Sequence, residues 1–178
     1  MKQSTDYIID SIRTTLERDI EETEKFVDMI ISSPNVFIYG VGRSGLIAKA
    51  FAIRLVQMGL EVYFVGETIT PIVKKDNLVI IVSQTGNTMS CIQTANIVRR
   101  EGARVVSITA NDHSKLANAS NLVVHINPDK DDQRGVLAPL GTLFEDATLI
   151  YLDGIVAQLM QKLGQSEGSM RRRHAIWV

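Results

Sequence analysis

Residues 36–45 read VFIYGVGRSG, an apolar run of β-forming residues that leads into a loop with three glycines. Residues 78–88 repeat this arrangement, with LVIIV followed by SQTGNT. Both loops precede segments with helical periodicity. A helix N-terminus with free backbone N–H groups and nearby hydroxyls is a ready anion site. Two such loops on neighbouring strands predict that both deliver donors to one phosphorylated ligand.

Strands and helices alternate between residues 34 and 126. The predicted strands are mostly continuous apolar runs, which is typical of parallel strands buried on both faces. They cover residues 36–40, 62–65, 78–82, 104–109 and 122–126. The predicted helices cover residues 44–58, 87–101 and 113–118. This alternation predicts an α/β three-layer sandwich with a roughly five-stranded parallel sheet flanked by helices, and ligands bind such sheets at the strands' carboxyl ends.

The segments outside this core complete a single domain of 178 residues. Residues 1–33 are predicted to form an N-terminal helix, with apolar positions at steps of three and four over residues 4–31. This helix packs either on its own domain or on a partner subunit. Residues 127–141 predict a polar surface loop. Residues 142–178 predict a last helix, to about residue 163, and a tail.

The composition excludes several classes of partner. The net charge of −1 provides no basic field for nucleic acid. Cys91 is the single cysteine, which excludes an internal disulfide and a cysteine-rich zinc site. No apolar run reaches the roughly 18–20 residues that cross a bilayer, and the polar, acidic N-terminus is unlike a signal peptide. We therefore expect a cytoplasmic protein with neither nucleic-acid nor membrane partners.

The first loop has three interpretations. Residues 40–45 match the dinucleotide fingerprint G-x-G-x-x-G, and Glu67 follows the second strand where a ribose-binding carboxylate belongs. Arg43 and Ser44 instead suit a terminal phosphate, because a guanidinium and a hydroxyl both donate to its oxygens. Alternatively, the glycines serve only a tight turn. Arg43 could also pair with a carboxylate such as Glu67.

The second loop is more specific because Ser83, Thr85 and Thr88 place three hydroxyls in six residues. One hydroxyl would be enough to cap a helix. Gly86 permits close backbone approach. The predicted phosphate-binding residues of the two loops are Gly42, Arg43, Ser44, Ser83, Gln84, Thr85, Gly86, Asn87 and Thr88.

The ordered set of motifs resembles the sugar isomerase (SIS) domain family, and within it the 6-phospho-3-hexuloisomerases. The matching stretches are IYGVGRSG at 38–45, FVGETITP at 64–71, SQTGNT at 83–88 and PLGTLFE at 139–145. The resemblance extends to Arg173 and His174 and covers nearly the whole chain. The family's second loop often reads S-x-S-G-x-T, and Thr85 keeps the hydroxyl at the position that differs.

The resemblance implies a flavodoxin-like SIS fold and reversible isomerisation between 3-hexulose 6-phosphate and fructose 6-phosphate through an enediol. Such a reaction needs no redox cofactor and no obligatory metal. The resemblance also implies a homo-oligomer, commonly a tetramer, with sites near subunit boundaries. It matches Glu145 to the family's proton-accepting base, and it makes His174 a candidate proton shuttle at the sugar oxygens of its own or a neighbouring subunit.

Several residues have a second interpretation. Residues 142–145 read TLFE, a capping-box pattern in which Glu145 only holds the helix end. His174 lies in a basic tail, His113 in a turn, and His125 in an apolar strand, where structural roles are usual. Thr68 and Thr70 could line the sugar pocket, as could Asn111, which also fits an Asn-Asp turn. Two other functions stay open: a related aldose–ketose isomerase and a non-catalytic phosphosugar sensor.

Overall fold

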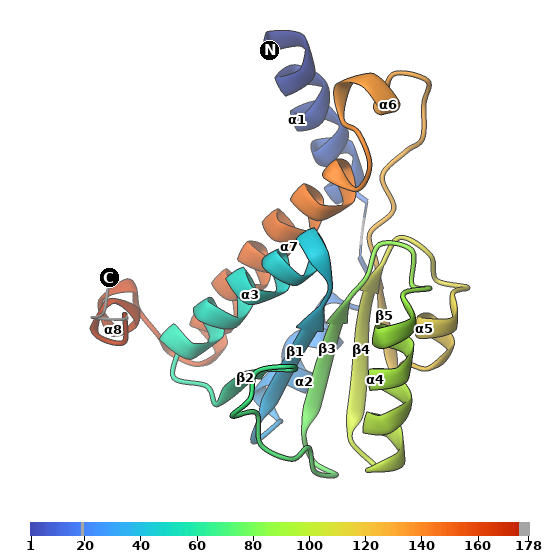
Figure 1. Ribbon diagram of the computed structural model, residues 1–178. Coiled ribbons are helices and arrows are strands. Elements are labelled where there is room, and N and C mark those ends of the chain that lie inside the picture. Colours follow the sequence, from blue (N-terminus) through green and yellow to red (C-terminus); the bar gives the residue numbers. More distant parts are fainter. Residues whose placement is uncertain (19, 175–178) are drawn as a thin grey trace.

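Five strands form one parallel sheet in the computed structural model, which describes residues 1–18 and 20–174 (Figure 1). The strands are β1 (Val36–Gly40), β2 (Val62–Phe64), β3 (Leu78–Val82), β4 (Arg104–Thr109) and β5 (Leu122–His125). Their order is β2-β1-β3-β4-β5, with Ile80 opposite Ile38 on one side and Val106 on the other. The predicted parallel sheet is confirmed, with strand ends within one residue of the expected positions.

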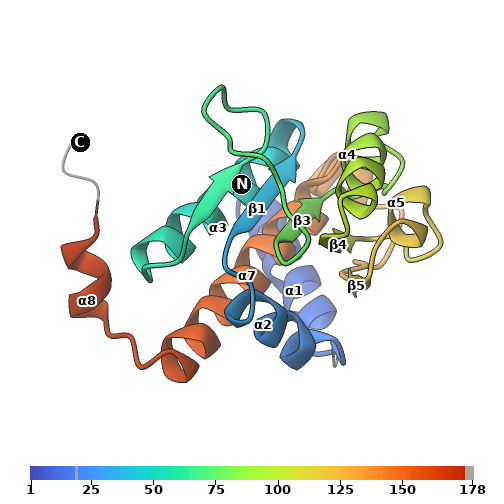
Figure 2. The same cartoon turned by 90° about the horizontal axis from the view of Figure 1, so that it is seen from below.

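Helices cover both faces of the sheet (Figure 2). Alternate strand residues serve the two faces, so Ile38 packs in a larger apolar core and Phe37 in a smaller one. The larger core is covered by α3 (Gly42–Gln57), α7 (Thr142–Lys162) and the N-terminal helices. The smaller core is covered by α4 (Met89–Arg100) and α5 (Lys115–Asn118). This arrangement is the predicted three-layer sandwich.

The predicted single N-terminal helix is two helices, α1 (Lys2–Leu16) and α2 (Thr23–Ile31). Residues 17–22 hold no glycine or proline, so the break has no local signal in the sequence. Tertiary contacts explain it: Arg18 donates to Asp129 at 2.6 Å, and Ile20 packs against the larger core. Both helices pack on their own domain, with α1 against α7 and α2 against α7 and β5.

The polar loop 127–141 contains a short helix, α6 (Arg134–Leu137), and lies beside α1 (Figure 1). The hydroxyl of Ser4 donates to the Leu137 carbonyl, and the hydroxyl of Tyr7 donates to Asp131 at 2.9 Å. At the other end of α7, α8 (Glu167–Arg172) follows in the tail. Within the described residues, no helix is both long and apolar enough to span a membrane.

Candidate active site

The glycines of the first loop satisfy backbone requirements at the turn from β1 to α3. Gly42 has φ +60°, a left-handed conformation that L side chains rarely adopt. A Cβ at Gly45 would lie 2.6 Å from the carbonyl oxygen of Gly40. β1 and α3 can therefore approach this closely only because residue 45 has no side chain. The tight-turn interpretation therefore accounts for the glycines, and the chemistry of the loop falls to Arg43 and Ser44.

Arg43 is held by carboxylates of α7. Its Nε donates to Glu145 Oε2 in an ion pair, and its Nη2 lies 3.6 Å from Asp146 Oδ1. The hydrogen bond and the charge of Glu145 raise the pKa of the Arg43 guanidinium. Arg43 pairs with a carboxylate, as suggested, but its partner is Glu145 and not Glu67, which accepts from Lys49 Nζ at 3.0 Å. Arg43 thus joins the first loop to the predicted base.

Glu145 is buried in the first turn of α7, with only 7% of its surface exposed. The helix begins after Gly141, so Thr142 lies inside it, and the Thr142 hydroxyl donates to the Pro139 carbonyl at 2.7 Å. The capping-box interpretation is therefore wrong. The Glu145 carboxylate faces the first loop instead, where Ser44 Oγ lies 3.4 Å from Oε1.

The second loop folds around its own hydroxyls. Ser83 Oγ donates to Thr88 Oγ1 at 3.3 Å, and the Asn87 N–H donates to Thr85 Oγ1 at 3.2 Å. Thr88 is the N-cap residue of α4, yet its side chain makes no capping hydrogen bond to the described chain. The simple helix-cap interpretation is thus wrong for Thr88. The first turn of α4 therefore lacks a side-chain cap from Thr88, and its N–H groups are suited to binding an anion.

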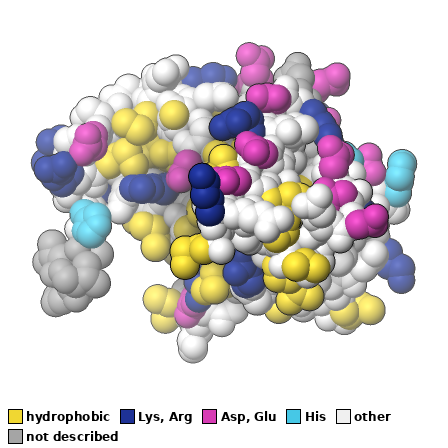
Figure 3. Space-filling view, turned by 90° about the horizontal axis from the view of Figure 1, so that it is seen from above, with side chains coloured by type: hydrophobic (Ala, Val, Ile, Leu, Met, Phe, Trp, Pro, Cys, Tyr) yellow, Lys and Arg dark blue, Asp and Glu magenta, His cyan; other side chains and the backbone are white. Residues whose placement is uncertain are grey.

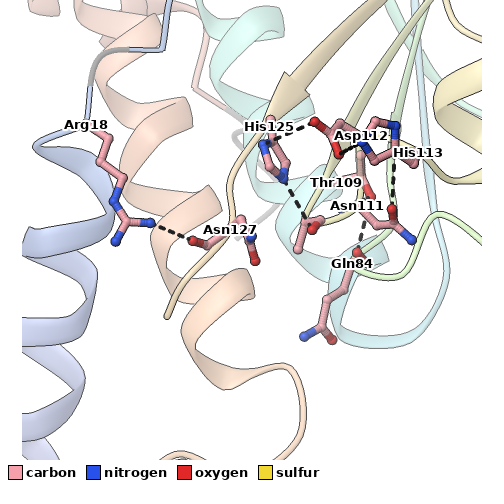
Figure 4. A network of polar contacts seen from close by, with 9 residues as sticks. Arg18, Gln84, Thr109, Asn111, Asp112, His113, His125 and Asn127 are labelled. Carbon is pink, nitrogen blue, oxygen red and sulfur yellow. Dashed lines mark hydrogen bonds and ion pairs between the residues drawn. The ribbon is translucent and has the colours of Figure 1, made fainter. Parts of the chain in front are cut away.

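Gly86 and Gln84 tie the second loop to its surroundings. Gly86 has φ +62°, and a Cβ there would lie 2.0 Å from Ser114 Oγ at the start of α5. The Gln84 carbonyl accepts from the Thr109 hydroxyl at 3.1 Å (Figure 4). The side-chain amide of Gln84 and the Glu145 carboxylate both lie against Gly141. The two predicted loops and the predicted base therefore meet at the carboxyl edge of the sheet.

Other candidates serve local structure. Thr70 donates to the Phe64 carbonyl at 2.8 Å, which fixes the loop after β2. Asn111 Oδ1 accepts from the His113 N–H at 3.2 Å, so it forms the Asn-Asp turn (Figure 4). His113 is exposed, and His125 Nε2 lies 3.3 Å from the Ala110 carbonyl oxygen, as expected of a surface and a structural histidine.

His174 lies far from the Glu145 of its own chain. Glu145 is in the first turn of α7, whereas His174 follows α8 beyond the last turn (Figure 1). His174 lines a cavity with Asp153, Val156 and Ala157, which lie about 12–18 Å along the α7 axis from Glu145. Nearby, the guanidinium of Arg173 packs over Gly59 and donates to the Gln57 carbonyl at 3.2 Å. The fold therefore does not bring the two predicted catalytic residues together within one chain.

The charge of the surface gives the site no long-range field of one sign. Seen from above, acidic and basic side chains lie side by side on the face of the molecule in Figure 3. This pattern agrees with the net charge of −1. Any attraction of an anion to this face must therefore come from local donors, such as Arg43 and the N-terminus of α4.

A family model described as the SIS domain matches residues 29–145, which include both loops and Glu145. The chain belongs to the SIS domain family. This SIS chain is 37% identical to the 3-hexulose-6-phosphate isomerase of Bacillus subtilis, over 87% of its own length and 86% of the relative's. It is 34% identical to the enzyme of that name from Methanocaldococcus jannaschii, over 85% and 81% of the two chains.

A solved SIS structure also matches. A Methanococcus jannaschii protein, whose crystal structure led to an inferred function as 3-hexulose-6-phosphate isomerase, superposes with a TM-score of 0.89. The two are 30% identical, and the match covers 99% of each chain. The match extends the likeness beyond the family-model segment to the N-terminal helices and the tail.

Three residues of the site were missed by sequence reasoning. Gly141 lies between Gln84 and Glu145, Asp146 faces Arg43, and Thr109 holds the Gln84 carbonyl. Thr109 could have been found, because it is a hydroxyl at the carboxyl end of a predicted strand. The other two stand beside Glu145 in the sequence, but only the packing of α7 against the loops gives them their partners.

Proposed function

We propose that this SIS chain is a phosphosugar isomerase that interconverts 3-hexulose 6-phosphate and fructose 6-phosphate. The observation that carries the proposal is the buried carboxylate of Glu145 beside Arg43 and Ser44, where the two anion-binding loops converge. The 3-hexulose-6-phosphate isomerases among its relatives supply the substrate. A carboxylate shielded from water and held near a bound sugar suits general-base catalysis.

The chemistry needs one base and one adjacent cation. Glu145 removes the proton on C3 of fructose 6-phosphate, and the electron pair forms the C2–C3 double bond of an enediol. The C2 oxygen takes up a proton as the enediol forms. The C3 hydroxyl then loses its proton as one returns to C2, which moves the carbonyl from C2 to C3, and the reverse sequence remakes fructose 6-phosphate. Because negative charge passes from the carboxylate to the enediol oxygens, the neighbouring Arg43 guanidinium is placed to stabilise it.

The second loop is assigned to the phosphate. The hydroxyls of Ser83, Thr85 and Thr88 are assigned to the phosphate oxygens. The dipole of α4, a helix of 12 residues, favours an anion at the first turn of that helix. The N–H groups of Gly86 and Asn87 donate within the loop, to the Ser83 carbonyl and to Thr85 Oγ1. The first-turn N–H groups of α4 are therefore the stronger backbone donors.

A homo-oligomer would give His174 a role. His174 lies beside the middle of α7 rather than at the first turn that carries Glu145, which favours a role for His174 in the site of another subunit. Apolar side chains on the outer face of α3, including Leu46, Ile53 and Val56, are available for subunit packing. Tetramer formation and a cytoplasmic location stay predictions. Sedimentation of His174→Ala and wild type, together with activity of each, tests the shared site.

The decisive experiment is an NMR time course with fructose 6-phosphate in deuterated water. The wild type should incorporate deuterium at C3 and form a 3-hexulose. Glu145→Gln should lose about 100-fold or more of this exchange while keeping its affinity, because the general base is gone. Glu101→Gln, an exposed change at the end of α4, is the matched control.

Other outcomes select the alternatives. Deuterium at C1 with an aldose product would support a related aldose–ketose isomerase. Binding without exchange would support a phosphosugar sensor, and absence of binding would contradict the phosphate cradle. Calorimetry with NAD tests the dinucleotide interpretation of residues 40–45, for which a flat titration is expected.

A further inference from the structure

We propose that the side chain of Gln84 positions the Glu145 carboxylate, and that residue 141 is glycine because these two side chains fill the space beside its Cα. This role rests on the proposed function, in which Glu145 is the base. It also gives Gln84 a role different from that of the neighbouring hydroxyl residues, which are assigned to the phosphate.

The geometry at Gly141 carries the proposal. A Cβ at this residue would lie 2.9 Å from Gln84 Oε1, 3.0 Å from Glu145 Cδ and 3.1 Å from Glu145 Oε1. Groups that are each about 3 Å from one point lie within about 6 Å of each other. The end of the Gln84 side chain, which follows β3, and the carboxylate of α7 are therefore neighbours across Gly141.

The backbone of Gly141 does not itself require glycine. Its φ of −87° and ψ of 3° are open to L residues, in contrast to the φ of +62° at Gly86. A Cβ at residue 141 would instead crowd the ends of the Gln84 and Glu145 side chains, so these two ends would have to move from their positions. A close-packed arrangement of this kind transmits a small displacement to both side chains.

The main chain of Gln84 is fixed. Its carbonyl accepts from Thr109 Oγ1 at 3.1 Å and from the Ala110 N–H at 3.0 Å, which anchors the residue to the end of β4. From this anchor the side chain extends away from Thr109 (Figure 4). A long side chain on a fixed backbone can hold a neighbouring group in one orientation.

The chemistry of an amide suits this task. The carboxamide can donate an N–H to a carboxylate without carrying a charge. The other polar groups facing Glu145 are Arg43, Ser44 and Asp146. The Arg43 guanidinium balances the charge of the carboxylate, whereas the neutral Gln84 amide can orient the carboxylate without adding a charge.

The first test compares Gln84→Ala and Gln84→Glu with wild type. Gln84→Ala should lower kcat about 10- to 100-fold, with an unchanged inhibition constant for inorganic phosphate. In Gln84→Glu a second carboxylate faces Glu145, so the acid limb of the kcat/KM profile should move to higher pH. Gln93→Ala, exposed on α4, is the matched control.

The second test compares two glycines. Gly141→Ala should lower kcat as Gln84→Ala does, whereas Gly154→Ala in α7 should not, because a Cβ there meets nothing within 4 Å. Circular dichroism establishes folding of each variant. If Gly141→Ala does not fold, the two Gln84 variants decide the question.

A readout without turnover separates this role from the proposed function. In protein labelled at its carboxyl carbons, the Glu145 resonance should titrate at higher pH in Gln84→Glu than in wild type. An unmoved titration, or a Gln84→Ala variant that binds phosphate more weakly with an unchanged kcat, would overturn the positioning role. A wild type that shows no exchange would instead overturn the isomerase, with the titration still deciding the role of Gln84.

Discussion

Arg43 and Glu145 are 102 residues apart in the sequence and form an ion pair that joins the first turn of α3 to the first turn of α7. The carboxylate end of this pair is buried and the guanidinium end is 59% exposed. Glu145 is therefore the buried and fixed member of the pair, and the Arg43 guanidinium is the member that solvent or a ligand can reach. An incoming sugar phosphate would meet the guanidinium before it meets the base.

Removal of the cation should affect both stability and turnover. Arg43→Gln leaves the buried Glu145 carboxylate without its charged partner, so we expect a loss of about 1 kcal/mol in the free energy of unfolding. The value is small because Arg43 is largely exposed. Deuterium exchange should fall about tenfold or more. Urea unfolding measures the stability, and deuterium incorporation measures the exchange rate. Arg99→Gln, an exposed change on α4, is the control. If the two variants behaved equally in both measurements, the role of Arg43 would be contradicted.

The turn at Gly86 should not accept a side chain. Gly86→Ala places a Cβ in a left-handed backbone conformation and against Ser114, so we expect a loss of about 1–2 kcal/mol or more. The distorted loop should also bind phosphate more weakly. Gly135→Ala, where a Cβ meets nothing within 4 Å, is the control. Calorimetric titration with inorganic phosphate gives the comparison, and full affinity in Gly86→Ala would refute the phosphate assignment of this loop.

Tyr151 should make stability fall at alkaline pH. Burial raises the pKa of Tyr151 to about 12, while its hydrogen bond with Thr23 opposes the rise. An unfolded tyrosine loses its proton near pH 10, so the folded chain binds more protons between about 10 and 12. The contribution of Tyr151 to the free energy of unfolding is complete below pH 10. This contribution of about 2–3 kcal/mol is lost as pH rises from about 10 to about 12.

Tyr151→Phe provides the comparison for that loss. Because phenylalanine does not titrate, the variant should lack this part of the alkaline decline in the free energy of unfolding. Denaturant curves at several alkaline pH values measure it for both proteins. Parallel declines in the two would show that other groups cause the loss.

The thiol of Cys91 should be inert in the folded protein. Cys91 is buried in α4, and burial raises its pKa to about 11, against the opposing hydrogen bonds of Ser83 and Ser90. Because the thiolate is the reactive form, a disulfide reagent at pH 8 should react roughly 100-fold slower with native than with denatured protein. Equal rates would mean that α4 opens readily from the loop that carries Ser83.

The sequence predicts the sheet well because its strands are buried on both faces and therefore read as unbroken apolar runs, as in residues 78–82. It also places both loops at one edge, since the carboxyl ends of parallel strands meet there. The break after α1 and the partner of Arg43 were not predictable. Both are set by contacts between segments more than 100 residues apart, for which local patterns hold no signal.

The anchoring of α1 to the loop 127–141 has a consequence for folding. The hydrogen bond from Ser4 to Leu137 spans 133 residues, and the bond from Tyr7 to Asp131 spans 124. During synthesis, α1 therefore gains these partners only after the loop 127–141 has been made. Contacts of such high sequence separation slow folding, so we expect α1 to dock late, and the loop that leads to Glu145 to reach its final position only then.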